Sequence, residues 1–199
     1  MSGEENISPC RFFFAEKRVS CYNVSNCFVF SGTTGNKRGQ SMLTCITHSP
    51  EETAHLAGTI GKIIHEGTVI CLDGELGVGK TLFVRALART LGVESDVTSP
   101  TFNLMNIYEA ACPIVHFDLY RIESEEELED IGFYEYAEAT EGIVLIEWAE
   151  KFIDAMPADR LQVNIADLGG EERQFTFAAE GELSTALLEE LSDIVDPEH

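Results

Sequence analysis

Basic side chains are scarce in this 199-residue sequence. It has 13 Lys and Arg residues against 35 Asp and Glu residues, and its formal net charge is -22. Such a charge repels a nucleic-acid phosphate backbone unless a local basic patch overrides it. The composition therefore argues against tight binding of DNA or tRNA by this chain alone. It is compatible with docking to a basic protein surface, and equally with a merely solvated acidic surface.

Long apolar runs and paired cysteines are also missing. No run of about 18 apolar residues occurs, so no transmembrane helix and no membrane partner are expected. The six cysteines include no C-x-x-C pair and no histidine at zinc-finger spacing, which argues against a structural zinc site. The cytoplasm is therefore the expected compartment.

Length and composition suit a single domain. A chain of 199 residues that is 44% hydrophobic can bury one α/β core. Residues 1–41 differ from the rest, with a Phe12–Phe14 triplet and a linker-like stretch over 32–39. We expect a poorly structured N-terminal extension over 1–41, a compact domain over 42–192 and an acidic C-terminal tail over 193–199.

The most informative stretch is GELGVGKT at 74–81, which fits the pattern G-x-x-x-x-G-K-[ST] of a phosphate-binding P-loop. Its glycines let successive backbone N–H groups point at the phosphates of a nucleotide. Lys80 adds a cation, and Thr81 adds a hydroxyl for Mg²⁺. The predicted nucleotide-binding residues are Glu75, Leu76, Gly77, Val78, Gly79, Lys80, Thr81 and Leu82.

The flanks of this stretch agree with the same interpretation. Residues 69–72 form an apolar run typical of a buried parallel strand, and residues 82–91 have helical apolar spacing that stops at Gly92. A helix N-terminus would then face the phosphates. The alternative, a glycine-rich turn between core elements, does not account for this order of strand, loop and helix.

The remaining pattern predicts an α/β fold of the P-loop NTPase type. It is expected to be a three-layer sandwich, with a mixed, mostly parallel sheet and helices on both faces. Strands are expected over 42–48, 103–108, 114–118 and 143–146, helices over 50–65, 124–132 and 183–192, and a hairpin over 160–166 and 173–179.

Two carboxylates, Asp118 and Glu147, stand at the ends of apolar strands that follow the P-loop. Ligands of open α/β sheets collect at the carboxyl ends of strands, and Mg²⁺ prefers oxygen ligands. We therefore assign Glu147, together with Thr81, to the metal, and Asp118 to the metal shell or to the attacking water. The two roles can be exchanged, and either acid can instead cap a neighbouring helix.

Hydroxyl side chains are concentrated in the segment 98–101, which resembles a switch able to bind a γ-phosphate, although a plain loop is the competing account. The predicted catalytic set is Lys80, Thr101, Asp118 and Glu147. His116 lies on the same strand face as Asp118 and is interpreted as a core histidine whose hydrogen bonds are satisfied.

Four blocks together resemble the TsaE family of bacterial P-loop ATPases, formerly YjeE. They are GELGVGKT at 74–81 followed by FVRALA, VTSPTF at 97–102, HFDLYR at 116–121 and LIEWAEKF at 145–152, and the resemblance extends from about Met42 to about Ala179. The P-loop alone is unspecific, whereas the four blocks in this order are highly specific. Ala149 departs from a proline common in the family, and residues 1–41 have no typical counterpart.

The resemblance implies a Mg²⁺-dependent protein that binds and hydrolyses ATP, slowly without partner proteins. It would support the TsaD–TsaB complex in forming N6-threonylcarbamoyladenosine at position 37 of tRNAs that read codons beginning with A, so its contact with tRNA would be indirect. Lys80, Thr81, Thr101, Asp118 and Glu147 match functional positions of the family. The rival functions are a small-molecule kinase, which usually needs an arginine-rich lid, and a nucleotide-dependent interaction module without turnover.

Overall fold

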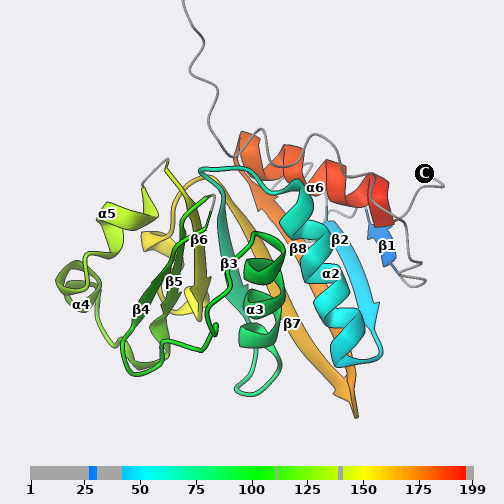
Figure 1. Ribbon diagram of the computed structural model, residues 1–199, viewed down its shortest axis with the longest axis horizontal. Coiled ribbons are helices and arrows are strands. Elements are labelled where there is room, and N and C mark those ends of the chain that lie inside the picture. Colours follow the sequence, from blue (N-terminus) through cyan, green and yellow to red (C-terminus); the bar gives the residue numbers. More distant parts are fainter. Residues whose placement is uncertain (1–26, 31–41, 111, 139–140, 196–199) are drawn as a thin grey trace, which may run out of the picture.

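The computed structural model describes residues 27–30, 42–110, 112–138 and 141–195 (Figure 1). The strands are β1 (Cys27–Phe30), β2 (Met42–Thr47), β3 (Val69–Asp73), β4 (Met105–Tyr108), β5 (Ile114–Asp118), β6 (Ile143–Glu147), β7 (Arg160–Gly169) and β8 (Glu172–Glu180). The α-helices are α2 (Pro50–Ile63), α3 (Lys80–Thr90), α4 (Glu125–Asp130), α5 (Phe133–Ala137) and α6 (Glu182–Val195), and two 3₁₀ helices are η1 (Leu119–Arg121) and η2 (Ala149–Ala155).

All eight strands form one mixed sheet in the order β1-β2-β8-β7-β3-β6-β5-β4. The four central strands, β7, β3, β6 and β5, are parallel to one another, and the outer pairs are antiparallel. The predicted mixed sheet is therefore confirmed, with the parallel pairing in its centre. The P-loop strand β3 lies between β6 and β7, so the carboxyl ends of β3, β5 and β6 meet at one edge.

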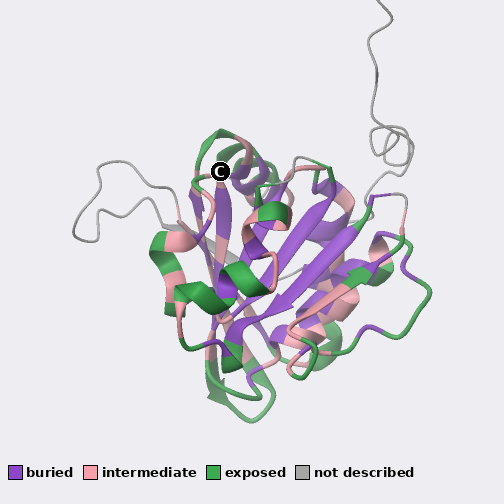
Figure 2. Cartoon of the chain, turned by 90° about the vertical axis from the view of Figure 1, so that its left-hand side faces the viewer, coloured by how far each residue is buried: buried purple, intermediate pink, exposed green. Residues whose placement is uncertain are grey.

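Helices cover both faces of this sheet. One apolar cluster joins α2, α3 and α6 to one face, and a second joins α4, α5 and η2 to the other. Strands β3, β5 and β6 are buried at every position, because both of their faces are covered. Figure 2 shows these buried strands in purple between layers whose outward residues are green or pink. The predicted three-layer sandwich is confirmed.

Successive side chains of β3 point to opposite faces of the sheet, so this one strand contributes to both apolar clusters. Ile70 and Leu72 belong to the cluster under α2 and α3, whereas Val69 and Cys71 belong to the cluster on the opposite face. Burial raises the pKa of the Cys71 thiol to about 12, and Asp73 nearby adds to this shift. Cys71 is therefore an unreactive core residue at neutral pH.

Most predicted elements are found within a few residues of their expected bounds. Helix α2 begins after Ser49, whose hydroxyl accepts a hydrogen bond from the Glu52 N–H, as the capping pattern predicts. Helices α5, η1 and η2 were not predicted, because each is too short to show a helical apolar period. Strands β7 and β8 extend the predicted hairpin at both sides of its turn.

The structure adds one strand near the start of the chain and extends the predicted C-terminal helix. Strand β1, within the segment expected to be poorly structured, pairs antiparallel with β2 at the sheet edge. Residues 1–26 and 31–41 lie outside the described residues, as does the end of the predicted tail at 196–199. Helix α6 continues through Val195, three residues beyond the helix end expected at 192.

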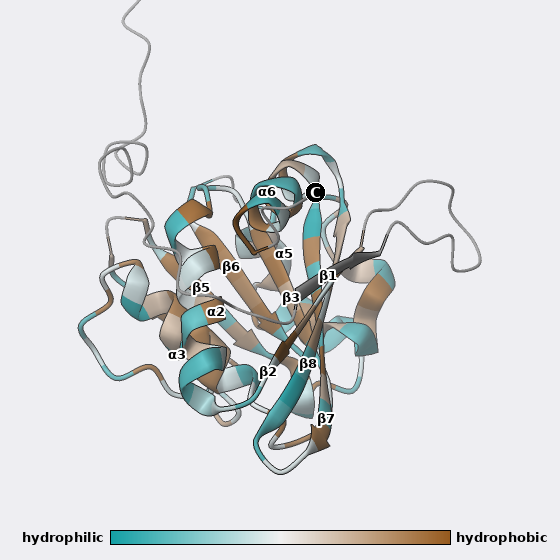
Figure 3. Ribbon diagram, turned by 90° about the vertical axis from the view of Figure 1, so that its right-hand side faces the viewer, coloured by the Kyte–Doolittle hydropathy of each residue, from teal (hydrophilic) through white to brown (hydrophobic). Residues whose placement is uncertain are grey.

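Surface hydropathy follows the same layering. In Figure 3, α2 and the start of β8 carry hydrophilic residues in teal, whereas the central strands are mainly brown. None of the helices in the described part of the chain combines the length and apolar character needed to cross a bilayer.

Candidate nucleotide site

The segment 74–79 links β3 to α3 through backbone angles that favour glycine. Gly74, Gly77 and Gly79 have φ values of 136°, 81° and 118°. At Gly74 a Cβ atom would also collide with the carbonyl oxygen of Ile165 on β7. Helix α3 begins immediately after Gly79, so its N-terminus opens onto the loop. The local geometry is that of a P-loop.

Lys80 lies inside this loop and is almost completely buried. Its Nζ donates to the carbonyl oxygens of Gly74 at 2.6 Å and Glu75 at 3.0 Å. The same Nζ is 3.7 Å from the ring centroid of Trp148. Burial lowers the pKa of Lys80, while the carboxylates of Glu147 and Asp118 oppose that shift. The ammonium group is therefore held at the loop by backbone oxygens and an aromatic face.

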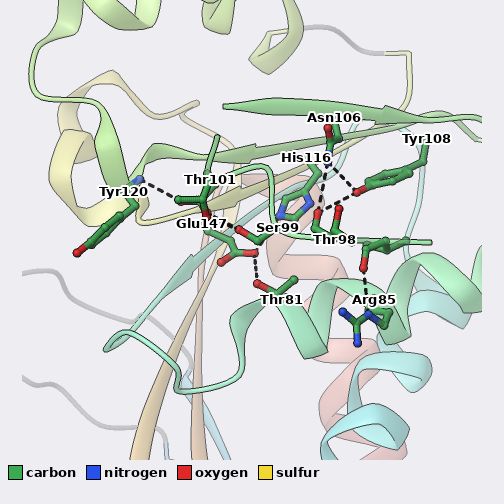
Figure 4. Close-up of polar contacts among 12 residues, drawn as sticks. Thr81, Arg85, Thr98, Ser99, Thr101, Asn106, Tyr108, His116, Tyr120 and Glu147 are labelled. Atoms are coloured by element: carbon green, nitrogen blue, oxygen red, sulfur yellow. Dashed lines mark hydrogen bonds and ion pairs between the residues drawn. The ribbon is translucent and has the colours of Figure 1, made fainter. Parts of the chain in front are cut away.

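Glu147 lies at the end of β6 and joins two neighbouring elements. Its Oε1 accepts a hydrogen bond from the Thr81 hydroxyl at 3.0 Å and lies 3.0 Å from Nε2 of His116 on β5. Figure 4 shows Glu147 between these two side chains. Glu147 and His116 are both buried. The carboxylate is therefore fixed beside the first turn of α3, with Oε2 left for a further partner.

Asp118 holds the hydroxyl-rich loop to the end of β5. Its Oδ2 accepts hydrogen bonds from Ser99 at 2.6 Å and from Thr101 at 2.5 Å, and its Oδ1 accepts from the backbone N–H of Tyr120 at 3.1 Å. The two hydroxyls are also 2.6 Å from each other. Asp118 thus caps η1 and fixes the loop at the same time.

The start of this loop is held from the other side. The Arg85 side chain on α3 donates to the carbonyl oxygen of Val97 at 3.0 Å, and the Tyr108 hydroxyl donates to that of Thr98 at 3.1 Å (Figure 4). The carbonyl oxygens of Val97 and Thr98 are therefore bound to side chains of α3 and β4, whereas the hydroxyls of Ser99 and Thr101 are bound to Asp118 and to each other. Backbone bonds add to this restraint, since the Leu104 N–H donates to the carbonyl oxygen of Pro100 and the Asp118 N–H donates to that of Leu104.

A cavity of about 380 Å³ opens over these groups. It brings together Lys80, Thr81, Thr101, Asp118 and Glu147, the five residues predicted as catalytic or metal-binding. The rest of its lining is Leu76, Gly77, Gly79, Leu82, Ser99, Tyr120 and Trp148. Of the predicted nucleotide-binding residues, Glu75 and Val78 are not in this lining. Glu75 borders a second hollow beside β7, and the Val78 side chain is buried in the core.

The chain was compared with protein-family models, with individual proteins and with solved structures. A family model described as "Threonylcarbamoyl adenosine biosynthesis protein TsaE" matches residues 47–175. The chain belongs to the TsaE family.

Individual relatives cover most of the same region. A Bacillus subtilis protein named tRNA threonylcarbamoyladenosine biosynthesis protein TsaE is 40% identical over 147 residues, which are 73% of this chain and 91% of that protein. A Treponema pallidum protein of the same name is 35% identical, over 68% of this chain and 100% of its own length. The crystal structure of Bacillus subtilis YdiB matches with a TM-score of 0.67 and 34% identity, over 78% of this chain and 97% of that one.

Two site residues of this TsaE-family chain were not recognised in the sequence. His116 was interpreted as a satisfied core histidine, yet its Nε2 lies on the Glu147 carboxylate and its buried Nδ1 has no partner among the described residues. Ser99 was placed in the switch-like segment but not among the site residues, and it binds Asp118 beside Thr101. For His116, the available sequence signal was the alternation of side chains along β5, which puts residues 116 and 118 on one face of the sheet.

The segment after β6 in this TsaE-family chain is fixed to the P-loop strand by backbone bonds. Trp148 has a left-handed φ of 65°, and its N–H donates to the carbonyl oxygen of Leu72 at 2.9 Å. Asp73 accepts the N–H of Glu150 at 2.9 Å. A bulky residue in this conformation needs such restraint, and strained backbone of this kind occurs often at functional sites. The restraint places the indole ring beside Lys80.

The donor set of this TsaE-family cavity fits a hard divalent cation. It offers the Thr81 hydroxyl and the carboxylates of Glu147 and Asp118. These are oxygen ligands of the kind that Mg²⁺ takes, together with water and phosphate oxygens. No thiol or accessible imidazole nitrogen faces the cavity among its lining residues, so the set does not favour zinc.

For the ATP hydrolysis that the family resemblance implies, His116→Leu is expected to lower the rate about tenfold with little change in ATP affinity, as the loss of a partner that orients a ligand does. Leucine removes the hydrogen bond that orients Glu147 but leaves Thr81 and Lys80 in place. ATPase rates and calorimetric ATP titrations of the variant measure the two effects separately. The exposed His65 provides a control with the same substitution, His65→Leu. An unchanged rate for His116→Leu would contradict a positioning role for His116.

Proposed function

We propose that this protein binds ATP with Mg²⁺ and hydrolyses it to ADP and phosphate. The observation that carries the proposal is the shared cavity in which Lys80 and Thr81 of a P-loop face two strand-end carboxylates, Asp118 and Glu147. Loop N–H groups and the N-terminus of α3 bind the phosphates, and Lys80 exchanges its carbonyl partners for phosphate oxygens. Leu76, Tyr120 and Trp148 would border the bound phosphates and limit access of water.

Charge supports the requirement for a cation. Asp118 and Glu147 contribute two carboxylates to the cavity, and Lys80 contributes one ammonium group. A triphosphate adds several further negative charges, which a partly buried cavity does not tolerate without compensation. A bound Mg²⁺ would supply that compensation and polarise the phosphates. Thr81 and Glu147 are the residues that would hold it, with Asp118 in its surroundings.

Hydrolysis also needs an oriented water molecule. Asp118 lies in the cavity and binds two loop hydroxyls, those of Ser99 and Thr101. Together these three groups can accept from and donate to a water placed in line with the γ-phosphate. His116 and Thr81 hold the Glu147 carboxylate in a fixed position. Glu147 would therefore keep the cation and the bound phosphates correctly placed for the reaction.

Membership of the TsaE family supports the biological assignment. We propose that this activity serves the TsaD–TsaB complex, in the cytoplasm, during threonylcarbamoyladenosine formation at position 37 of tRNAs that read codons beginning with A. The net charge of -22 favours action through protein partners over direct contact with tRNA.

The deciding experiment measures the release of ADP and of inorganic phosphate in parallel, with and without TsaD and TsaB. We expect equal amounts of both products and a higher rate when the two partners are present. A small-molecule kinase would release ADP without phosphate and would depend on an acceptor. An interaction module without turnover would bind ATP and release neither product. Either of these two results would contradict the proposed function.

A further inference from the structure

Arg173 connects the P-loop to the turn of the β7–β8 hairpin. Its side chain is 19% exposed. Nε donates to the carbonyl oxygen of Val78 at 3.0 Å, in the middle of the P-loop. The other side of the guanidinium binds the turn, where one terminal nitrogen lies 3.0 Å from Oδ1 of Asp167 and also donates to the carbonyl oxygens of Gly170 and Glu172.

The Val78 carbonyl belongs to the same peptide unit as the Gly79 N–H. A trans peptide is planar, so its carbonyl and its N–H point in opposite directions. Arg173 on β8 binds the carbonyl, and Gly79 lines the cavity, whereas Val78 and Arg173 do not. The bond to Arg173 therefore directs the Gly79 N–H toward the phosphate position.

Glycine makes this peptide unit easy to rotate. Gly79 has φ 118°, and a Cβ atom there would meet nothing within 4 Å, so no side-chain packing restrains it. The 78–79 peptide also lies outside the hydrogen bonding of α3. The first helical hydrogen bond runs from the Phe83 N–H to the carbonyl oxygen of Gly79, which belongs to the next peptide unit. A rotation of the 78–79 peptide would turn its N–H away from the phosphates and present a carbonyl oxygen instead. Arg173 opposes that rotation.

We propose that Arg173 is a positioning residue for phosphate binding, which fixes the 78–79 peptide so that the Gly79 N–H faces the phosphates. The proposal rests on the proposed function, since it assumes that the P-loop binds a nucleotide. It is distinct from the residues that line the cavity, because Arg173 is not among them. The guanidinium acts from outside the loop, through the backbone.

The test uses three variants of the full chain, Arg173→Ala, Arg173→Lys and Asp167→Asn, with calorimetric titration of ATP and Mg²⁺. Arg173→Ala is expected to weaken ATP binding about tenfold. Without the guanidinium, the Val78 carbonyl is released and the Gly79 N–H is no longer directed at the phosphates. Arg173→Lys keeps the charge and one donor, so we expect affinity within about threefold of the wild type. Asp167→Asn removes the ion pair at the turn but not the bond to Val78, so we expect affinity within about twofold.

A second measurement reports on the peptide itself. In protein labelled with ¹⁵N-glycine, the amide signal of Gly79 is expected to shift or broaden without nucleotide in Arg173→Ala but not in Asp167→Asn. Wild-type affinity in Arg173→Ala, or an equal loss in Asp167→Asn, would overturn the proposal while leaving ATP binding established. Failure of the wild-type protein to bind ATP would instead reject the proposed function, and this inference with it.

Discussion

Lys80→Ala is expected to weaken ATP binding about 100-fold, because it removes a charged donor from a buried phosphate site. This ammonium group is bound to two P-loop carbonyls and faces Trp148. No arginine or second lysine lines the cavity, so nothing among its lining residues can replace it. Calorimetric titration with ATP and Mg²⁺ measures the change directly.

The control for Lys80→Ala must separate binding from folding, since Lys80 is almost fully buried. Lys62→Ala, in the last turn of α2, removes the same side chain away from the cavity and should leave the affinity unchanged. Thermal unfolding of both variants shows whether the fold persists. Undiminished ATP affinity in a folded Lys80→Ala protein would refute the assignment of the P-loop.

Glu147→Gln is expected to lower the ATPase rate about 100-fold or more, while ATP binding is retained within about threefold. Glutamine has nearly the same shape and can keep a contact with Thr81 or His116, but it carries no charge for the cation. The loss should therefore affect the catalytic rate more than the ground-state complex. Steady-state rates in the presence of TsaD and TsaB provide the measurement.

Asp154→Asn is the matched control for Glu147→Gln. Asp154 is an exposed acid on η2, seven residues further along the chain, and it does not line the cavity. Its variant is expected to keep the wild-type rate. If Glu147→Gln hydrolyses ATP as fast as Asp154→Asn, Glu147 has no role in turnover and the hydrolytic centre must be sought elsewhere.

Local patterns were sufficient to predict the framework of the site. The glycine spacing at 74–81 identified the P-loop, and apolar runs that end in an acid identified β5 and β6. Because carboxyl ends of parallel strands meet at one edge, Asp118 and Glu147 could be placed together without coordinates. Their joint position beside Thr81 follows from this topology.

Contacts between distant segments could not be predicted in the same way. The bond from Arg173 to Val78 joins residues 95 positions apart, and the bond between His116 and Glu147 depends on the register of two strands. Neither has a signature in composition or periodicity. Helix η2 is too short to show a helical period, and its start is determined by the left-handed backbone of Trp148 and by the bond from the Glu150 N–H to Asp73 on β3.

The charged groups of the cavity already have partners within the protein. Lys80 is bound to P-loop carbonyls, Asp118 to two hydroxyls, and Glu147 to Thr81 and His116. An arriving nucleotide therefore exchanges these bonds for new ones, and its affinity reflects only the difference between the two sets. Under the proposed hydrolysis, the same exchange would ease release of the product, because the protein regains the bonds that it gave up. A cycle of the proposed hydrolysis would thus end with the same internal hydrogen bonds with which it began.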